Sequence, residues 1–398
     1  MSSNVLIAGV GMVPFRRPGQ SDPYDVMAEN AVRTALADAG IEYSLVDQAF
    51  ASFVYGDSCS GERALYRVGM TGIPITNVNN NCASGSSALY LARQAVLAGA
   101  AECALAVGFE QMQPGALDRV FPGHADPLER HRESVAAAMG FGEAERALPP
   151  ALMMFGSQLE WTARELHIPD EVFARIAVKA RAHARHNPYA IFRDPLTVEE
   201  VLAAPTVWGR LRKLYACPPS CGAAAVIVCS EPFARRHGLR TDVAILAHEI
   251  GSDISADLDP PNVPDALSRG AARRTADRAY AMAGVEPQDI DVAEVHDCFV
   301  SNELLTYACL GFCEEQDLER FVVEGRNTYG GQVVVCPSGG LLSKGHPLGA
   351  TGLAQITELA TQLRGSAGQR QVEGARTALQ HNGGLGTAVS VAILQRQG

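Results

Sequence analysis

The chain has 398 residues and a formal net charge of −11 at pH 7, with 47% hydrophobic and 19% charged residues. This composition is typical of a soluble globular enzyme, and the length suggests two or three domains. The acidic balance, without a dense run of basic residues, argues against nucleic acid and anionic membrane surfaces as partners. No stretch approaches 18 consecutive apolar residues, so we expect no membrane insertion.

The chain ends and the cysteines favour a reducing compartment. A strand-like Val5–Gly9 begins after four residues without a basic segment, and the last residues form no peroxisomal address, so we predict a cytoplasmic protein. Ten cysteines in 398 residues are too dilute for a disulfide scaffold. The pairs Cys217/Cys221 and Cys309/Cys313 lack a second ligand pair at zinc-site spacing, so we predict no metal site.

The sequence repeats itself, and the repeat predicts the architecture. Residues 31–50 match residues 275–294 at a constant offset, and each segment predicts an amphipathic helix, a glycine C-cap, a turn and a strand. The strands that open and close each copy also match: Val5–Gly11 with Val243–Gly251, and Gly222–Ser230 with Gly386–Leu394. The turn Ala83–Gly85 likewise matches Ala350–Gly352, which opens a helix in the second copy.

We therefore expect an α/β chain of two halves, 1–242 and 243–398, each with a largely parallel sheet. The first half is longer, and its excess lies at about 111–215. That stretch has helical runs and no strand pattern like that of the halves. We interpret it as an inserted, mostly helical loop domain, of the kind that often covers an active site.

Cys82 lies in a turn rich in Asn, Ser and Gly. A strand over Ile73–Val78 precedes it, and apolar residues at helical spacing follow as far as Leu97. Helix N-termini present free N–H groups and a positive dipole end, which stabilise a thiolate. Taken alone, Cys82 is better explained as a buried, inert thiol, which is the usual fate of a free cysteine.

Three stretches of the second half carry further candidates. His296–Phe299 follows a predicted strand, Ile290–Val295, at the end where open α/β sheets build their sites. The segment 337–352 contains five glycines and holds His346 just before a helix. Gln380–Gly386 is a glycine-rich turn that can aim backbone N–H groups at an anion, although it lacks the Lys and Ser/Thr of a phosphate loop. A packed His–Cys pair, a plain loop and a hairpin without function are the alternatives.

Together these stretches resemble the thiolase superfamily along the whole chain, and within it the sterol-carrier-protein type. The resemblance rests on four motifs, which are Asn79–Ser86, His296–Phe299, Gly345–Gly352 and Gln380–Gly383. Ordinary thiolases have Asn-Glu in place of His296-Asp297, and a second catalytic cysteine where this chain has Gln380-His381-Asn382. In the sterol-carrier type, the cysteine of the His-Asp-Cys-Phe motif, here Cys298, supplies that function. The resemblance implies two duplicated α/β halves stacked as a five-layered αβαβα core. From the last residue of the sequence, Gly398, we expect no lipid-transfer domain of the kind fused to some relatives.

The resemblance also implies a 3-ketoacyl-CoA thiolase that forms an acyl-cysteine intermediate. The implied catalytic residues are Cys82 as nucleophile, His346 as its base, Cys298 as acid and base, and His296 as holder of a water molecule. An oxyanion hole would be formed by backbone N–H groups of Cys82 and of the Asn382–Gly383 turn. Coenzyme A is the implied co-substrate, with no permanently bound cofactor, and a homodimer or homotetramer is the implied assembly.

Other functions on the same scaffold stay open. Some relatives are retro-aldolases for steroid side-chain CoA esters that work with a small OB-fold partner; they replace active-site histidines by tyrosines, whereas this chain keeps its histidines. A non-catalytic acyl-CoA-binding protein is a second alternative, and a decarboxylating ketosynthase would leave Cys298 without a task. The resemblance suggests bulky, branched or steroid-derived acyl chains. Residues that could meet the CoA phosphates, or form only a solvated basic patch, are His124, Arg130, His131 and Arg132.

Overall fold

A ten-stranded mixed sheet runs through the computed structural model, which describes residues 5–113, 121 and 123–398. Its strand order is β10-β9-β11-β12-β8-β1-β7-β4-β2-β3. The strands of the first half are β1 (Val5–Met12), β2 (Gln48–Ser52), β3 (Ile75–Val78), β4 (Cys103–Glu110) and β7 (Gly222–Ser230). Those of the second half are β8 (Val243–Gly251), β9 (Val292–Glu294), β10 (Val334–Val335), β11 (Thr377–Gly384) and β12 (Ala388–Arg396).

The two halves of the sheet have the same pattern. In the first, β2 lies parallel to β3 and β4, while β7 lies antiparallel to β4 and β1. In the second, β9 lies parallel to β10 and β11, while β12 lies antiparallel to β11 and β8. Each half-sheet is therefore mixed rather than largely parallel, because its closing strand returns as a neighbour of the opening one. Two antiparallel residue pairs between β1 and β8 join the halves edge to edge.

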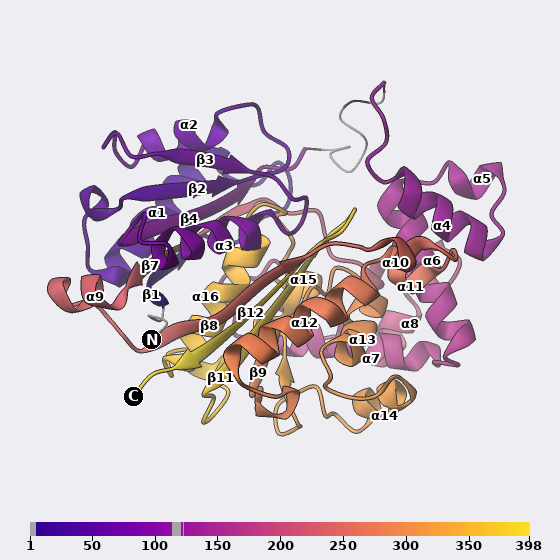
Figure 1. Cartoon of the computed structure of the whole chain (residues 1–398). Helices are drawn as coiled ribbons and strands as arrows, with labels where there is room; N and C mark the ends of the chain where they lie inside the picture. The colour runs from indigo at the N-terminus through magenta and orange to yellow at the C-terminus, as the bar shows by residue number, and fades with distance from the viewer. Residues whose placement is uncertain (1–4, 114–120, 122) are drawn as a thin grey trace.

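Helices complete five layers. The helices of the first half are α1 (Tyr24–Ala39), α2 (Ser60–Tyr66), α3 (Ser84–Leu97) and α9 (Glu231–His237). Those of the second half are α10 (Ser255–Leu258), α11 (Val263–Ala266), α12 (Arg269–Ala283), α13 (Val300–Cys309), α14 (Leu318–Val323), α15 (Gly340–Ser343) and α16 (Thr351–Leu363). In Figure 1 the indigo first half lies above the orange and yellow second half, with α16 between them.

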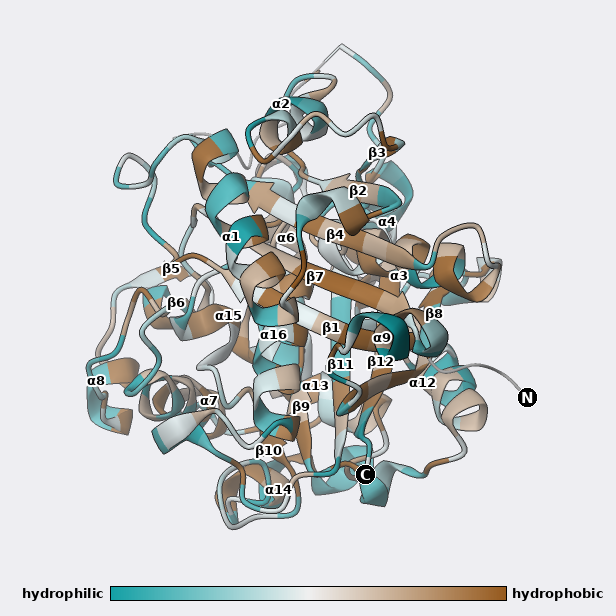
Figure 2. Cartoon of the chain, turned by 90° about the vertical axis from the view of Figure 1, so that its left-hand side faces the viewer, coloured by the Kyte–Doolittle hydropathy of each residue, from teal (hydrophilic) through white to brown (hydrophobic). Residues whose placement is uncertain are grey.

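The middle layer holds the central core. Helix α16 contacts β7, β1 and β4 of one half-sheet and β11, β9 and β12 of the other, and it packs against α3. Twelve of its thirteen residues are buried, as expected of a helix enclosed on all sides. The outer faces are covered by α1 on the first half and α12 on the second. Figure 2 shows β7 hydrophobic along its length, as a strand with helices on both faces must be.

The N-termini of α3 and α16 meet where the repeat predicts equivalent turns. A Cβ atom on Gly352 would lie 2.2 Å from the Ser86 hydroxyl, and one on Gly85 would lie 2.8 Å from the carbonyl oxygen of Gly349. Only glycine permits this approach. Because Cys82 lies in the turn before α3 and His346 in the loop before α16, the contact also brings the two side chains together.

Most elements follow the sequence pattern. Strands β7 and β8 have the predicted bounds, and α1 and α12 end at Gly40 and Gly284, both in the left-handed conformation. Several predicted bounds need correction: β3 begins at Ile75 rather than Ile73, β9 spans only Val292–Glu294, β12 spans Ala388–Arg396 rather than Gly386–Leu394, and β11 extends through Gly384. The last difference places Gln380–Gly384 in the strand, because each residue pairs with β12, and shortens the turn.

The segment at about 111–215 contains α4 (Glu129–Met139), α5 (Glu143–Arg146), α6 (Pro150–Glu165), α7 (Asp170–Ala184) and α8 (Val198–Leu202). It also contains a two-stranded sheet of β5 (Thr206–Trp208) and β6 (Leu211–Arg212), which the sequence did not indicate. Short 3₁₀ helices occur at Tyr43–Leu45, Lys213–Tyr215, Pro287–Asp289, Glu315–Asp317 and Gly368–Arg370. Residues 114–120 and 122 of this predicted domain lie outside the described part. Within that part, no helix is long and apolar enough to cross a membrane.

Candidate active site

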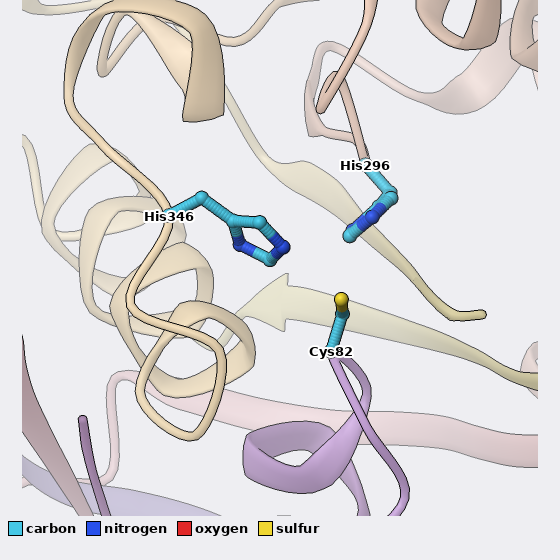
Figure 3. Close-up of side chains that lie close together, drawn as sticks. All are labelled: Cys82, His296 and His346. Atoms are coloured by element: carbon cyan, nitrogen blue, oxygen red, sulfur yellow. The ribbon is translucent and has the colours of Figure 1, made fainter. Parts of the chain in front are cut away.

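Four predicted catalytic residues line one cavity of about 530 Å³: Cys82, His296, Cys298 and His346. Cys82 comes from the turn before α3, His296 and Cys298 from the loop after β9, and His346 from the loop before α16. The Cys82 sulfur and one ring nitrogen of each of the two histidines all lie within 4.8 Å of one another. Figure 3 shows the two imidazole rings facing the thiol.

The turn that carries Cys82 is held by its own polar side chains. The Asn80 N–H donates to the Ser84 hydroxyl at 2.8 Å, and that hydroxyl donates to the Asn81 carbonyl at 2.6 Å. Asn81 adopts a left-handed conformation with φ 51°, and its side-chain amide donates to the carbonyl of Leu385 at 3.2 Å. Burial raises the pKa of Cys82 to about 12, against an opposing effect of the Leu385 backbone N–H. The resting nucleophile is therefore a thiol.

His346 is fixed in one tautomer by Thr351. Its Nδ1 lies 2.7 Å from the Thr351 hydroxyl, and that hydroxyl donates its only proton to the Pro347 carbonyl at 2.9 Å. Nδ1 must therefore carry the proton and donate, which leaves Nε2 as a bare acceptor. Nε2 is buried with no partner among the described residues. Burial lowers the pKa of His346 to about 3, so the ring is neutral and able to accept a proton.

Substituting Thr351 tests this arrangement. We expect Thr351→Val to lower kcat/KM by about 10- to 100-fold. Without the hydroxyl, the buried Nδ1–H of His346 loses its hydrogen-bond acceptor, which costs about 1–3 kcal/mol, and the ring is no longer held in the tautomer that leaves Nε2 unprotonated. Thr351→Ser, which restores the hydroxyl, should stay within about threefold of the wild type. Steady-state kinetics and thermal melting of both variants provide the check. Equal activity of Val and Ser variants would show that Thr351 does not orient His346.

The pKa directions of Cys82 and His346 predict a neutral resting pair. Since the pKa of the thiol is raised to about 12, the thiolate fraction should grow about tenfold with each pH unit between pH 7 and 10. Alkylation of Cys82 by iodoacetamide, followed by peptide mass mapping, should therefore accelerate over that whole range. Exposed Cys59 is an internal control for the reagent. A rate that is already constant at pH 7 would indicate a thiolate–imidazolium pair instead.

His296 and Cys298 belong to one tight loop. The His296 carbonyl accepts from the Asn302 side-chain amide at 2.5 Å, and the Cys298 carbonyl accepts from the Cys217 N–H at 2.9 Å. Burial, followed by the proximity of His346 and His381, holds the pKa of His296 well below its usual range. Burial also holds the pKa of Cys298 well above its usual range, so this residue rests as a proton-bearing thiol.

Asp297 ties the loop of His296 and Cys298 to the segment before His346. Its carboxylate accepts the backbone N–H of Leu341 at 2.7 Å and of Leu342 at 3.3 Å. Burial raises its pKa to about 7, and the Leu341 N–H opposes that rise. Gly340 has φ +60°, and a Cβ atom there would lie 2.0 Å from the carboxylate. The glycine run thus permits a carboxylate clamp between two catalytic loops.

Glu110 makes a second clamp, between the two halves. At the end of β4 its buried carboxylate accepts the N–H groups of Val54, Tyr55 and Gly349, at 3.1, 3.0 and 3.1 Å. Burial raises its pKa to about 7. The loop that follows His346 is therefore fastened to the half that carries Cys82.

The comparisons with known proteins agree along the whole chain. Residues 5–232 match the family model "Thiolase, N-terminal domain", and residues 260–396 match "Thiolase C-terminal domain-like". The chain belongs to the thiolase family. It is 47% identical over 393 residues to human sterol carrier protein 2, covering 98% of this chain and 71% of that protein. It is also 31% identical to the benzoylsuccinyl-CoA thiolase subunit BbsB of Thauera aromatica, covering 97% and 96% of the two chains.

A solved structure, the Ltp2-ChsH2(DUF35) aldolase, has the same fold as this thiolase-family chain. It superposes with a TM-score of 0.82 at 24% identity and covers 99% of this chain and 98% of its own. Family and relatives together make this chain an acyltransferase that resembles the sterol-carrier-protein type, as the motifs predicted. Coenzyme A thioesters are the substrates of the family to which it belongs.

The oxyanion-hole residues predicted for this thiolase remain a prediction. Asn382 and Gly383 lie on β11 rather than in a turn, and Gly383 lines a small cavity behind His296 instead of the large one. The Asn382 side chain donates to Gln355 at 3.2 Å, which holds the end of β11 against α16. The backbone N–H groups that lower the pKa of the Cys82 thiol are those of Leu385 and of Cys82 itself.

The residues suggested for the CoA phosphates separate into two groups. His124 lines the large cavity. His131 is buried and bonded to Asp253 at 2.8 Å, and Arg132 donates to Asp126 at 2.8 Å. His131 thus ties the helical segment to the second half, and its burial differs from the solvated basic patch considered as the alternative.

Sequence reasoning missed several groups at the site. Hydrogen bonds that no motif spacing reveals explain the contributions of Thr351, Glu110 and Asp297. Asp297 nevertheless belongs to the motif His296–Phe299. Cys217 lines the same cavity as Cys298 and was considered only as a metal ligand. Its signal in the sequence was its place in Cys217-Pro218-Pro219, a stiff stretch just before a closing strand.

A metal ion could reach Cys82, His296 and His346 together, since their ligand atoms lie within 4.8 Å. Sulfur and imidazole are ligands that zinc prefers. The same three groups are also a nucleophile, its base and a hydrogen-bond donor. The chemistry of an acyltransferase accounts for them without a metal.

Proposed function

We propose that this chain is a 3-ketoacyl-CoA thiolase (acetyl-CoA C-acyltransferase) that acts in lipid degradation by β-oxidation. One observation carries the proposal: the Cys82 thiol, the imidazole of His346 and the thiol of Cys298 line a single cavity. A nucleophile, a base with a free Nε2 and a separate proton donor are the groups that a covalent acyl transfer with carbon–carbon cleavage requires.

The first half-reaction would cleave the substrate. The Cys82 sulfur attacks the keto carbon while His346 Nε2 takes the thiol proton. The bond between C2 and C3 then breaks, the shortened acyl group stays on Cys82 as a thioester, and the electron pair leaves as the enolate of acetyl-CoA. Cys298 donates its proton to C2 of that enolate. Its high pKa suits it to this step, because it keeps the proton until a strong base forms.

The second half-reaction would regenerate the enzyme. The Cys298 thiolate takes the proton of an incoming CoA thiol, and the CoA sulfur attacks the thioester on Cys82. The acyl-CoA leaves, and the imidazolium of His346 returns its proton to the Cys82 sulfur. Coenzyme A is thus a co-substrate, and both cysteines end as they began.

Oxygen atoms that gain charge need donors. The enolate oxygen would meet His346 and a water held by His296, and the acyl oxygen would meet the N–H of Cys82 and one from Asn382 or Gly383. Each such donor contributes roughly 3–4 kcal/mol to lowering the barrier. The N–H groups at the start of α3 also place a positive dipole end near the thiolate.

The cavity favours a bulky acyl chain, such as a branched or steroid-derived one. Its volume of about 530 Å³ lies within the range of sites for drug-sized ligands. Its apolar lining includes side chains from the helical segment and from both halves: Met112, Phe121, Pro150, Phe155, Phe299 and Leu348. The helical segment would thus contribute to specificity for the acyl chain, whereas the catalytic groups come from the two halves.

Intact-protein mass spectrometry is the deciding experiment. The chain is mixed with short, branched and steroid-like 3-ketoacyl-CoA esters without free CoA, and the acylated peptide is mapped. We expect an acyl adduct on Cys82 that free CoA removes as a shortened acyl-CoA. No adduct with any ester would refute the thiolase proposal and point to a non-catalytic acyl-CoA-binding protein.

A retro-aldolase is the second candidate, supported by the structural likeness to the Ltp2-ChsH2(DUF35) aldolase. It would act on 3-hydroxyacyl-CoA esters and require a small OB-fold partner. The retained cysteines and histidines favour the thiolase. Release of an aldehyde or ketone from a 3-hydroxyacyl-CoA, only when that partner is added, would decide for the aldolase.

For either activity we expect a homodimer or homotetramer, which light scattering tests. We also expect a cytoplasmic location, which cell fractionation tests.

A further inference from the structure

A second cavity, of about 320 Å³, lies on the other side of the segment Cys217–Pro219, which lines both cavities. Three cationic side chains line it: Arg17 from the loop after β1, Arg181 from α7 and Lys213 from the 3₁₀ helix after β6. Among the described residues that line it there is no aspartate or glutamate. We call this cavity the basic pocket.

The cations of the basic pocket form no ion pair with a carboxylate of the described residues. Within the described part of the chain, Arg17, Arg181 and Lys213 form no ion pair within 4.0 Å, whereas many other arginines do. Burial lowers the pKa of Arg181; the more distant charge of Asp194 opposes this and that of Arg17 adds to it. Three cations that converge without an ion pair create a local positive potential in a protein whose net charge is −11.

The two guanidinium groups are held in place by one aromatic ring. Arg181 lies 4.2 Å and Arg17 lies 5.0 Å from the centroid of Phe192. Stacking of this kind fixes the plane of a guanidinium while leaving its N–H edges free to donate. Planar N–H pairs match the oxygens of a phosphate in a bidentate way. The geometry is that of a preorganised receptor for an oxyanion.

Backbone hydrogen bonds also connect the basic pocket to the segment that carries the catalytic base, His346. The Phe192 N–H donates to the Ser343 carbonyl at 3.0 Å, and Ser343 lies three residues before His346. Ser343 lines the pocket, and its buried hydroxyl has no partner in the described structure. Pro219, which also lines the pocket, forms an isolated β-bridge with His346, and the hydroxyl of the next residue, Ser220, accepts the backbone N–H of His346 at 3.0 Å.

We propose that the basic pocket binds a phosphate group carried by a small molecule, from pyrophosphate to a nucleotide in size. Arg17 and Arg181 donate to the phosphate oxygens from the two guanidinium groups stacked on Phe192, and Lys213 adds a third charge. The ligand touches the segments that carry Cys217 and Ser343, so its presence is transmitted to the acyl-binding cavity and to His346. Phosphates of CoA itself or of a free anion have the same chemistry here.

Calorimetric titration of the full chain with inorganic pyrophosphate at low ionic strength tests the site. We expect one saturable site whose affinity falls as salt is added. Arg17→Gln and Arg181→Gln should each weaken binding by about tenfold or more, because each removes charge-assisted hydrogen bonds. Arg376→Gln removes the same charge at an exposed arginine outside the pocket, one that forms no ion pair within 4.0 Å in the described part of the chain, and this variant should bind within about twofold of the wild type.

The source of the phosphate is resolved by a second titration, into chain saturated with CoA. If CoA abolishes pyrophosphate binding and dephospho-CoA does not, the pocket holds the 3′-phosphate of CoA. If pyrophosphate still binds, the pocket serves a separate anion. The proposal is overturned if no saturable binding occurs, or if Arg17→Gln and Arg181→Gln bind as tightly as Arg376→Gln. Arg17 lies on an exposed loop, so its variant keeps the fold and a melting curve verifies this. Binding is measured without turnover, so the result does not depend on the thiolase proposal.

Discussion

Replacing Cys82 by alanine should lower the rate of 3-ketoacyl-CoA thiolysis by about 10⁴-fold or more, because the acyl group then has no sulfur to receive it. The variant should still fold, since the Cys82 side chain only borders the cavity and its turn is held by Ser84 and Asn80. The loss of thiolysis is measured by monitoring the release of acetyl-CoA by chromatography. The adduct seen by mass spectrometry should vanish with it.

Cys217→Ala is the matched control for Cys82→Ala. Cys217 is a second half-buried thiol that lines the same cavity, and it has no role in the proposed steps. We expect its variant to keep acetyl-CoA release within a few-fold of the wild type. Full activity of Cys82→Ala, or an adduct that maps to Cys217, would remove Cys82 from the mechanism.

Replacing Cys298 by alanine should lower thiolysis by about 10²- to 10⁴-fold, the usual contribution of a general acid or base. The physical reason is that the enolate of acetyl-CoA would find no proton at C2. The same loss should appear in the exchange of the acetyl-CoA methyl protons with deuterated solvent. Proton exchange measured by NMR therefore tests the role of Cys298 separately from that of the nucleophile.

An activated ester distinguishes a chemical role of Cys298 from a structural one. A p-nitrophenyl ester has a leaving group that departs without a general acid, so it should acylate Cys82 in Cys298→Ala within about threefold of the wild-type rate. If ester acylation and thiolysis fall together, Cys298 shapes the cavity rather than moving protons.

Much of the fold could be predicted from the sequence, because the sequence patterns that indicate it are local and occur in both halves. Helix periodicity and the glycine caps Gly40 and Gly284 act within a few residues, and the matching segments 31–50 and 275–294 revealed the duplication. Strand direction was less accessible. Whether a closing strand such as β7 returns antiparallel depends on which neighbours it finds, and no window of sequence contains that information.

The site could be predicted by motif and only partly by physics. Cys82 and His346 stood out because glycines and a helix start surround each of them, yet their residue numbers are far apart and only the resemblance joined them. The hydrogen bond from His346 to Thr351 spans five residues, but its meaning depends on where the Thr351 proton goes. The carboxylate of Glu110 reaches Gly349 across the whole chain, so its function as a clamp required the fold.

The close approach of Gly85 and Gly352 has a consequence for how this molecule can diversify. The distance between the nucleophile and its base depends on the absence of a Cβ atom at Gly85 and Gly352, although neither glycine belongs to the reacting groups. A larger residue at Gly85 or Gly352 would require a compensating change in the other segment, so the sequences around these two glycines can change only together. The apolar walls of the large cavity are under no such constraint. New acyl specificities can therefore arise in Phe121, Pro150 or Phe155 while the reacting groups keep their distance.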